Sequence, residues 1–332
     1  MEKSLVKLSA CLLRAASLAM AAAIFAASGT SAQSPASRYP EKPIKIIVPF
    51  APGGSTDVLA RVIGQKLTEN WGQPVIVDTR PGGSTIIGTA LAAKADPDGY
   101  TLIIVVSNLV TNPALYATMP YDAIKDFEPI SLLGRAPIVI YTNPTFPPNN
   151  VKELVALAIG KPGTLNFGSA GPASMTHLTA ELLKLQQGLD MTHVVYRGGA
   201  PALNDLLAGQ IPMTFATVIQ ALSQYQAGLV RALGVAASER HKSIPNVPTF
   251  REQGFDILVM EWYGLLAPAG TPKPIIAKLS AEMRRILALP EVAERLAAIE
   301  MLGSSPEELG TFIRGEIDRW TPIIKKLGIK PD

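Results

Sequence analysis

The sequence is short of the residues that mark several classes of protein. Its 332 residues include one cysteine and three histidines, and only 17% of them are charged. A disulfide-stapled miniprotein needs many more cysteines, and a coiled coil or a disordered chain needs more charge. The 30 basic residues nearly balance the 27 acidic ones and form no long runs, so we expect no nucleic-acid partner.

Signatures of catalysis and of cofactor binding are also missing. Gly168-Ser169-Ala170-Gly171 is not a nucleophile elbow, because Phe167 stands where that motif requires glycine. A dinucleotide-binding G-x-G-x-x-G motif and a phosphate-binding G-K-[ST] motif are absent. His177, His193 and His241 are scattered without metal-ligand spacing. We therefore expect no catalytic residues, no metal and no cofactor.

The N-terminus has the pattern of a secretory signal peptide. Basic residues precede a small, apolar run over 15–27, which is too short to span a membrane core that needs roughly 20 residues. Small residues before Gln33 predict a signal peptide over 1–32, cut between Ala32 and Gln33. Cys11 precedes the apolar run, so it is not a lipoprotein acceptor and leaves with the signal peptide. The exported chain then has no disulfide.

Short apolar strands alternate with helical patterns along the rest of the chain. The first strands are expected over 44–48, 75–77 and 102–106, with helices over 58–67 and 86–94 between them. This order favours parallel pairing. A second series has strands over 138–141, 165–167, 194–196, 213–215 and 231–235 and helices over 151–159, 176–187, 201–207 and 219–227.

The C-terminal stretch has no sheet of its own. Leu265-Leu266 is the last expected strand, and amphipathic helical patterns follow it. Helices of this kind must cover the sheet of another domain. We therefore predict an α/β protein with a discontinuous domain I over 38–134 plus 259–332 and a domain II over 135–258. The two crossings near Arg135 and Met260 predict a hinge and a central cleft.

The most informative motif is repeated. Pro52-Gly53-Gly54-Ser55-Thr56 recurs as Pro81-Gly82-Gly83-Ser84-Thr85, and each copy follows a strand and opens a helix. Parallel neighbouring strands bring both turns to one edge of a sheet. Glycines let backbone N–H groups approach a ligand, the hydroxyl residues are expected to cap the helices, and the helix dipole adds positive charge. The pair predicts an anion site; two ordinary tight turns are the alternative.

Further small and hydroxylated residues follow other strands and complete the predicted cleft walls. Ser107 and Asn108 extend the first wall, while Ser169-Ala170-Gly171 and Phe215-Ala216-Thr217 form the second. Asp57 is expected to complement the dipole of its helix rather than to act as a base. Glu261-Trp262-Tyr263 is interpreted as packing at the hinge.

Motifs along nearly all of the exported chain resemble one family. They include Val48-Pro49-Phe50 with Pro52-Gly53-Gly54, Asp98-Gly99-Tyr100, Asn112-Pro113-Ala114 and Gly264-Leu265-Leu266-Ala267-Pro268. The chain resembles the Bug family, the solute-binding proteins of tripartite tricarboxylate transporters. This resemblance implies a type II periplasmic-binding-protein (Venus flytrap) fold with two α/β domains, a periplasmic location and a monomer. It also implies a small di-, tri- or aromatic carboxylate as ligand, delivered to membrane permease subunits.

The resemblance also implies where the ligand lies. The family's ligand loops fall on residues 50–56 and 81–85, opposite Ser169-Ala170-Gly171 and the stretch near Phe215. Many members carry an acid where Ala216 stands, so we expect a ligand without an ammonium group. A sensory co-receptor working with a membrane kinase is an alternative function. An exported hydrolase is a weaker one, because no nucleophile–base pair is evident.

Overall fold

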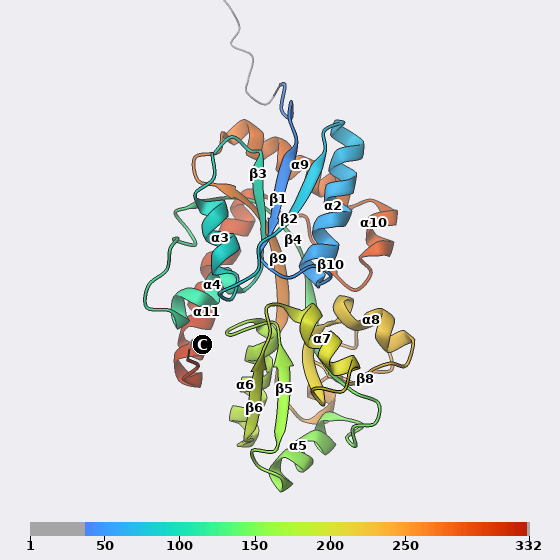
Figure 1. Cartoon of the computed structure of the whole chain (residues 1–332). Helices are drawn as coiled ribbons and strands as arrows, with labels where there is room; N and C mark the ends of the chain where they lie inside the picture. Colours follow the sequence, from blue (N-terminus) through green and yellow to red (C-terminus); the bar gives the residue numbers. More distant parts are fainter. Residues whose placement is uncertain (1–36, 331–332) are drawn as a thin grey trace, which may run out of the picture. The chain divides into compact units, whose positions relative to one another are not determined.

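The computed structural model describes residues 37–330 (Figure 1). The predicted signal peptide, its cleavage site and Cys11 lie outside the described residues. Arg38 and the residues after it form one compact unit, so the predicted boundaries of domains I and II stay a prediction. Within the described part of the chain, no helix is both long and apolar enough to cross a membrane.

Sheet A contains the repeated turns. The strands β2 (Val75–Thr79), β1 (Ile44–Val48) and β3 (Thr101–Val105) are parallel, which confirms the predicted pairing. The strand β9 (Met260–Pro268) lies antiparallel beside β3. The register pairs Val48 at the end of β1 with Thr79 at the end of β2, so the turns that follow these strands leave from the same edge.

The strand β4 (Phe127–Thr142) runs through both sheets. Its first part pairs with β9 in sheet A, and its residues from Ile138 pair with sheet B. The sequence predicted only 138–141, because Pro129, Gly134 and Pro137 disguise the earlier part and two bulges interrupt its register. A short strand, β10 (Glu300–Met301), also pairs with β4, so the prediction that the last strand is Leu265-Leu266 was wrong.

Sheet B, like sheet A, combines parallel strands with antiparallel ones. The strands β7 (Met213–Thr217), β5 (Leu165–Ser169) and β6 (Met191–Val195) are parallel, while β8 (Arg231–Val235) and β7 are antiparallel to β4. In Figure 1 the green and yellow helices gather around β5 and β6. They are α5 (Val151–Gly160), α6 (Met175–Gln187), α7 (Gly199–Leu207) and α8 (Val218–Gln226), and the 3-10 helix η1 (Arg251–Gln253) follows β8.

The remaining helices cover sheet A. They are α2 (Ser55–Trp71), α3 (Ile86–Ala93), α4 (Asn108–Leu115), α9 (Lys273–Leu287) and α10 (Pro290–Arg295). The helix α2 packs against β1 and β2, and α9 packs against β4. The sequence did not predict α4, because Asn108, Asn112 and the internal Pro113 are poor helix formers.

The last helix, α11 (Pro306–Leu327), joins the cores of the two sheets. A capping box formed by Ser305 and Glu308 fixes its start. Leu309 and Ile313 pack with the core of sheet A, while Trp320 and Ile324 pack with the core of sheet B. The C-terminal helix is therefore not confined to sheet A, although the sequence assigned it to domain I.

Candidate ligand-binding cleft

The loop between β1 and α2 is the first of the repeated turns. Gly53 has a φ of 84°, a left-handed conformation that favours glycine. Gly54 is the N-cap of α2 and its side-chain cap is absent, so the prediction that hydroxyl residues cap the helix was wrong here. Instead, the Asp57 carboxylate accepts the Gly53 N–H at 2.9 Å and complements the helix dipole, as the sequence predicted.

The loop between β2 and α3 is strained. Gly82 and Gly83 have φ values of 130° and 52°, and Ser84 and Thr85 follow with values of 47° and 77°. Two successive non-glycine residues in the left-handed region are costly and persist only when their surroundings hold them. Thr85 is the N-cap of α3 without a side-chain cap bond, so the predicted hydroxyl capping was wrong at this turn as well.

Side chains from α4 hold the strained loop. Asn112 Nδ2 donates to Ser84 O at 2.7 Å, and Asn108 Nδ2 donates to Ser84 Oγ at 2.9 Å. Ser84 Oγ in turn donates to the Pro172 carbonyl at 2.6 Å, in the loop that follows β5. Thr111 Oγ1 donates to Ala173 O at 2.9 Å in the same loop. The loops of sheet A therefore bond directly to the loops of sheet B.

Two adjacent cavities lie among these loops. The larger cleft cavity measures about 210 Å³ and the smaller cleft cavity about 30 Å³. Phe50 and Ala170 line both of them. The other predicted site residues that line the larger one are Gly82, Gly83, Ser84, Thr85 and Gly171. Those that line the smaller one are Gly54, Ser55, Thr56 and Thr217.

Seven predicted site residues do not line either cavity. Pro52 and Gly53 are exposed, Ser107 and Asn108 are buried supports of the cleft wall, and Ser169, Phe215 and Ala216 are fully buried. Phe215 and Ala216 point into opposite cores of sheet B, because successive side chains of a strand alternate between faces. Since Ala216 packs with Val139 and Leu203, it gives no information about an ammonium group on the ligand.

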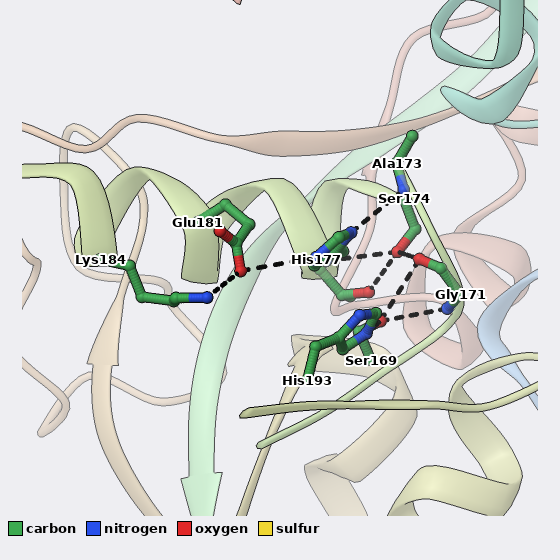
Figure 2. A network of polar contacts seen from close by, with 9 residues as sticks. Ser169, Gly171, Ala173, Ser174, His177, Glu181, Lys184 and His193 are labelled. Carbon is green, nitrogen blue, oxygen red and sulfur yellow. Dashed lines mark hydrogen bonds and ion pairs between the residues drawn. The ribbon is translucent and has the colours of Figure 1, made fainter. Parts of the chain in front are cut away.

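Ser169 has an unexpected partner (Figure 2). Its Oγ lies 2.6 Å from His193 Nε2, and the His193 ring stacks on His177 with centroids 3.8 Å apart. Burial, followed by the charge of His177, lowers the pKa of His193 to about 3, so its imidazole stays neutral. The sequence did not foresee this serine–histidine pair. Ser169 is nevertheless fully buried, and it also accepts the Gly171 N–H at 3.1 Å, so the pair braces the loop beside the cleft.

Comparison with known proteins identifies the chain. A family model described as "Tripartite tricarboxylate transporter family receptor" matches residues 59–329. The chain belongs to this receptor family. The resemblance seen in the sequence is therefore confirmed, and the receptor has the α/β periplasmic-binding-protein fold that the resemblance implied.

Three solved structures are similar to this receptor. The periplasmic binding protein BugD is 34% identical, with a TM-score of 0.85, 88% of this chain covered and 99% of BugD. Rpa4515 of R. palustris, solved with adipate, is 33% identical, with a TM-score of 0.85 and coverage of 89% and 100%. MatC from Rhodopseudomonas palustris, solved with malate, is 33% identical, with a TM-score of 0.81 and coverage of 86% and 100%.

Sequence reasoning missed two charged residues of the receptor's cleft. Among residues 37–330, Arg197 is the only charged residue that lines the larger cavity, and Glu261 is the only one that lines the smaller cavity. Arg197 lies in the turn after β6, and its exposed side chain was not selected as a site residue. Glu261 was interpreted as hinge packing, because nothing in a strand sequence tells which face meets a cleft.

Glu261 is held at the base of the smaller cavity. Its Oε1 accepts the N–H of Ser107 at 3.1 Å and that of Trp262 at 3.2 Å. Those bonds favour the ionised carboxylate, but burial outweighs them and raises the pKa of Glu261 to about 7. Glu261 is 7% exposed, and no lysine, arginine or histidine of the described part of the chain lines this cavity to compensate its charge.

A cavity of about 570 Å³ lies elsewhere in the receptor, beside the predicted hinge residues Arg135 and Met260. Its three arginines already have acidic partners: Arg135 bonds to Glu300, Arg240 to Glu252 and Arg319 to Glu316. The cleft cavities are therefore the candidate ligand site, in preference to this larger space. Within the described residues, no group of three or more His, Cys, Asp or Glu side chains could hold a metal ion.

Proposed function

We propose that the receptor captures a small organic carboxylate in the cleft and delivers it to the membrane permease subunits of a tripartite tricarboxylate transporter. The observation that carries this proposal is that residues at the starts of two helices line the two adjacent cavities. The first turn of α2 lines the smaller cavity, and the loop before α3 lines the larger one. The first N–H groups of α2 have no intrahelical acceptor and carry a partial positive charge. In α3 the N–H groups of Ile86 and Ile87 already donate to the Gly83 and Gly82 carbonyls, so this helix contributes the positive charge of its dipole.

The charge of the larger cavity supports the same class of ligand. Arg197 is the only charged residue in its lining within the described part of the chain, and it presents donors suited to a carboxylate. A dicarboxylate could therefore place one end near α2 and α3 and the other near Arg197. Adipate in Rpa4515 and malate in MatC, both dicarboxylates, are ligands of relatives that match nearly this whole chain.

We propose that the receptor acts in the periplasm. The predicted signal peptide over 1–32 supports export to the periplasm, where a monomeric receptor would meet its permease. N-terminal sequencing of the exported protein should begin at Gln33. Reciprocal cross-linking to the permease subunits, and loss of carboxylate uptake in a strain lacking the receptor, would test the transport step.

Ligand capture is tested by a thermal-shift screen. A ligand at 100 times its Kd stabilises the folded state by about 2.7 kcal/mol, so a true ligand raises the melting temperature clearly. The panel should contain mono-, di- and tricarboxylates, including adipate, malate and aromatic carboxylates, with neutral sugars as controls. Native mass spectrometry of freshly purified receptor would identify a retained ligand. Shifts by neutral sugars alone would contradict the proposal.

A further inference from the structure

The smaller cleft cavity brings an acid close to an anion site. Glu261 shares its walls with Gly54, Ser55 and Thr56 of the α2 N-terminus. A volume of about 30 Å³ has room for only one or two water molecules. A carboxylate held by the N–H groups of α2 would therefore lie within a few Å of Glu261.

The unpartnered groups around this cavity are donors or can act as donors. Gln220 Nε2 and Thr217 Oγ1 line it, and both are buried without a hydrogen-bond partner among the described residues. The first N–H groups of α2 lack intrahelical acceptors. Such a surface suits a ligand group that accepts hydrogen bonds, and a carboxylate accepts without donating.

The groups packed against Glu261 do not neutralise it. The start of α4 contributes the Ser107 N–H, and α11 contributes Glu316, whose negative charge opposes the ionisation of Glu261. Glu316 itself bonds to Trp320 Nε1 at 3.0 Å. Tyr263, two residues after Glu261 in β9, is buried, and burial raises the pKa of its phenol, which stays neutral. The residues that line the cavity from sheet B and its helices include Thr176, Thr217 and Gln220, which are all uncharged. The charged pair Asp57–Arg61 of α2 is satisfied internally.

Two carboxylates in one small, buried site cannot both stay ionised at low cost, because each raises the pKa of the other. Resting on the proposed function, we propose that Glu261 makes ligand capture proton-coupled: the receptor binds its carboxylate ligand with Glu261 protonated and takes up a proton when Glu261 was ionised. Glu261 is then a specificity-determining residue, which admits a carboxylate below neutral pH and opposes it above.

Isothermal titration calorimetry with adipate as the probe tests this inference. With a Glu261 pKa of about 7, the protonated fraction falls about 25-fold between pH 6.5 and pH 8.5, and the affinity should fall by the same factor. At pH 8.5 the binding enthalpy should differ between two buffers of different ionisation enthalpy, because nearly one proton is taken up per adipate. The probe's own carboxylates titrate well below this range.

Two variants separate this role from a structural one. Glu261→Gln keeps the oxygen that accepts from Ser107 and Trp262, and it should bind adipate with the same affinity at both pH values and without proton uptake. Glu300→Gln removes a half-exposed acid that pairs with Arg135 and lines neither cleft cavity, and it should keep the pH response of the wild type. Proton uptake by the wild type is measured without any variant, so a misfolded variant does not remove the test.

The outcomes are distinguishable. Adipate binding that is equally tight at both pH values, without proton uptake, overturns the inference and leaves the proposed function intact. Preferential binding of an α-amino acid, stronger at high pH, also overturns it, because an ionised Glu261 would then pair with an ammonium group. If neither adipate, malate nor any other carboxylate of the panel binds at either pH, both proposals fail.

Discussion

The Asp57 carboxylate accepts the Gly53 N–H at 2.9 Å, and it also bonds to Arg61 on the next turn of α2. The exposed glycine of the first loop is therefore not a free donor, and the ligand is left with the amides that follow it. This relationship shapes the first loop and gives a direct test of it.

Two substitutions of Asp57 should differ in how much unfolding free energy they remove. Asp57→Ala leaves the Gly53 N–H without its acceptor and loses the favourable dipole charge, so the unfolding free energy should fall by about 1–3 kcal/mol. Asp57→Asn keeps an acceptor for Gly53 and should lose less than half as much. Urea unfolding measures both; equal losses would mean that the Gly53 bond contributes little.

Ser84 should couple the strained loop to the opposite wall of the cleft. Ser84→Ala removes the bonds from Oγ to Pro172 and Asn108, and we expect adipate affinity to fall several-fold, by about 1 kcal/mol. Ser84→Gly removes the same bonds but relieves the backbone strain at a φ of 47°, so it should melt at a higher temperature than Ser84→Ala. Unchanged adipate binding by Ser84→Ala would contradict this coupling.

Arg197 should discriminate between dicarboxylates and monocarboxylates. Arg197→Gln removes the one charge that the described residues place in the lining of the larger cavity, so adipate affinity should fall roughly fivefold while a monocarboxylate is less affected. Arg197→Lys should recover part of the loss. Calorimetry at low ionic strength gives the comparison, with Lys242→Gln, beside the distant cavity, as the charge control.

The His193 pair should make stability depend on pH. The folded imidazole stays neutral down to a pKa of about 3, whereas in the unfolded chain it takes a proton near pH 6.5. The stabilisation from this group is therefore complete above pH 6.5 and is lost as pH falls toward 3. His193→Gln should show a shallower decline of unfolding free energy over this range; parallel curves would argue against it.

Ser169→Ala should destabilise the receptor without changing hydrolysis of a model ester.

Glu261 should change the unfolding free energy with pH in the opposite direction to His193. Its pKa is raised from 4.5 to about 7 on folding, so wild-type stability falls as pH rises from about 4.5 to 7. Glu261→Gln should therefore be more stable than the wild type at pH 8, by at most about 3 kcal/mol, and equally stable near pH 4. Urea unfolding across this range measures the difference, which should not appear for Glu300→Gln at the surface.

Much of this receptor follows from sequence alone. The strand Ile44–Val48 was located correctly, because a short stretch rich in β-branched residues and stopped by proline has few alternatives. The repeated Pro-Gly-Gly-Ser-Thr turns were correctly brought to one sheet edge, since parallel strands end together. Glycine and proline at fixed places therefore determined where a ligand could approach the backbone.

The tertiary structure decided the rest, because it depends on register and on contacts between distant residues. Bulges set the path of β4 through both sheets despite Pro129 and Pro137. Alternation along β7 sent Phe215 and Ala216 into opposite cores, and Thr217 lines the smaller cavity because it stands at the end of the strand. The N–H of Ser107, at the start of α4, holds the Glu261 carboxylate where it lines the smaller cavity. The sequence gives the type of each side chain, but whether that side chain points into a core or lines the cleft is fixed by the neighbours that the fold supplies.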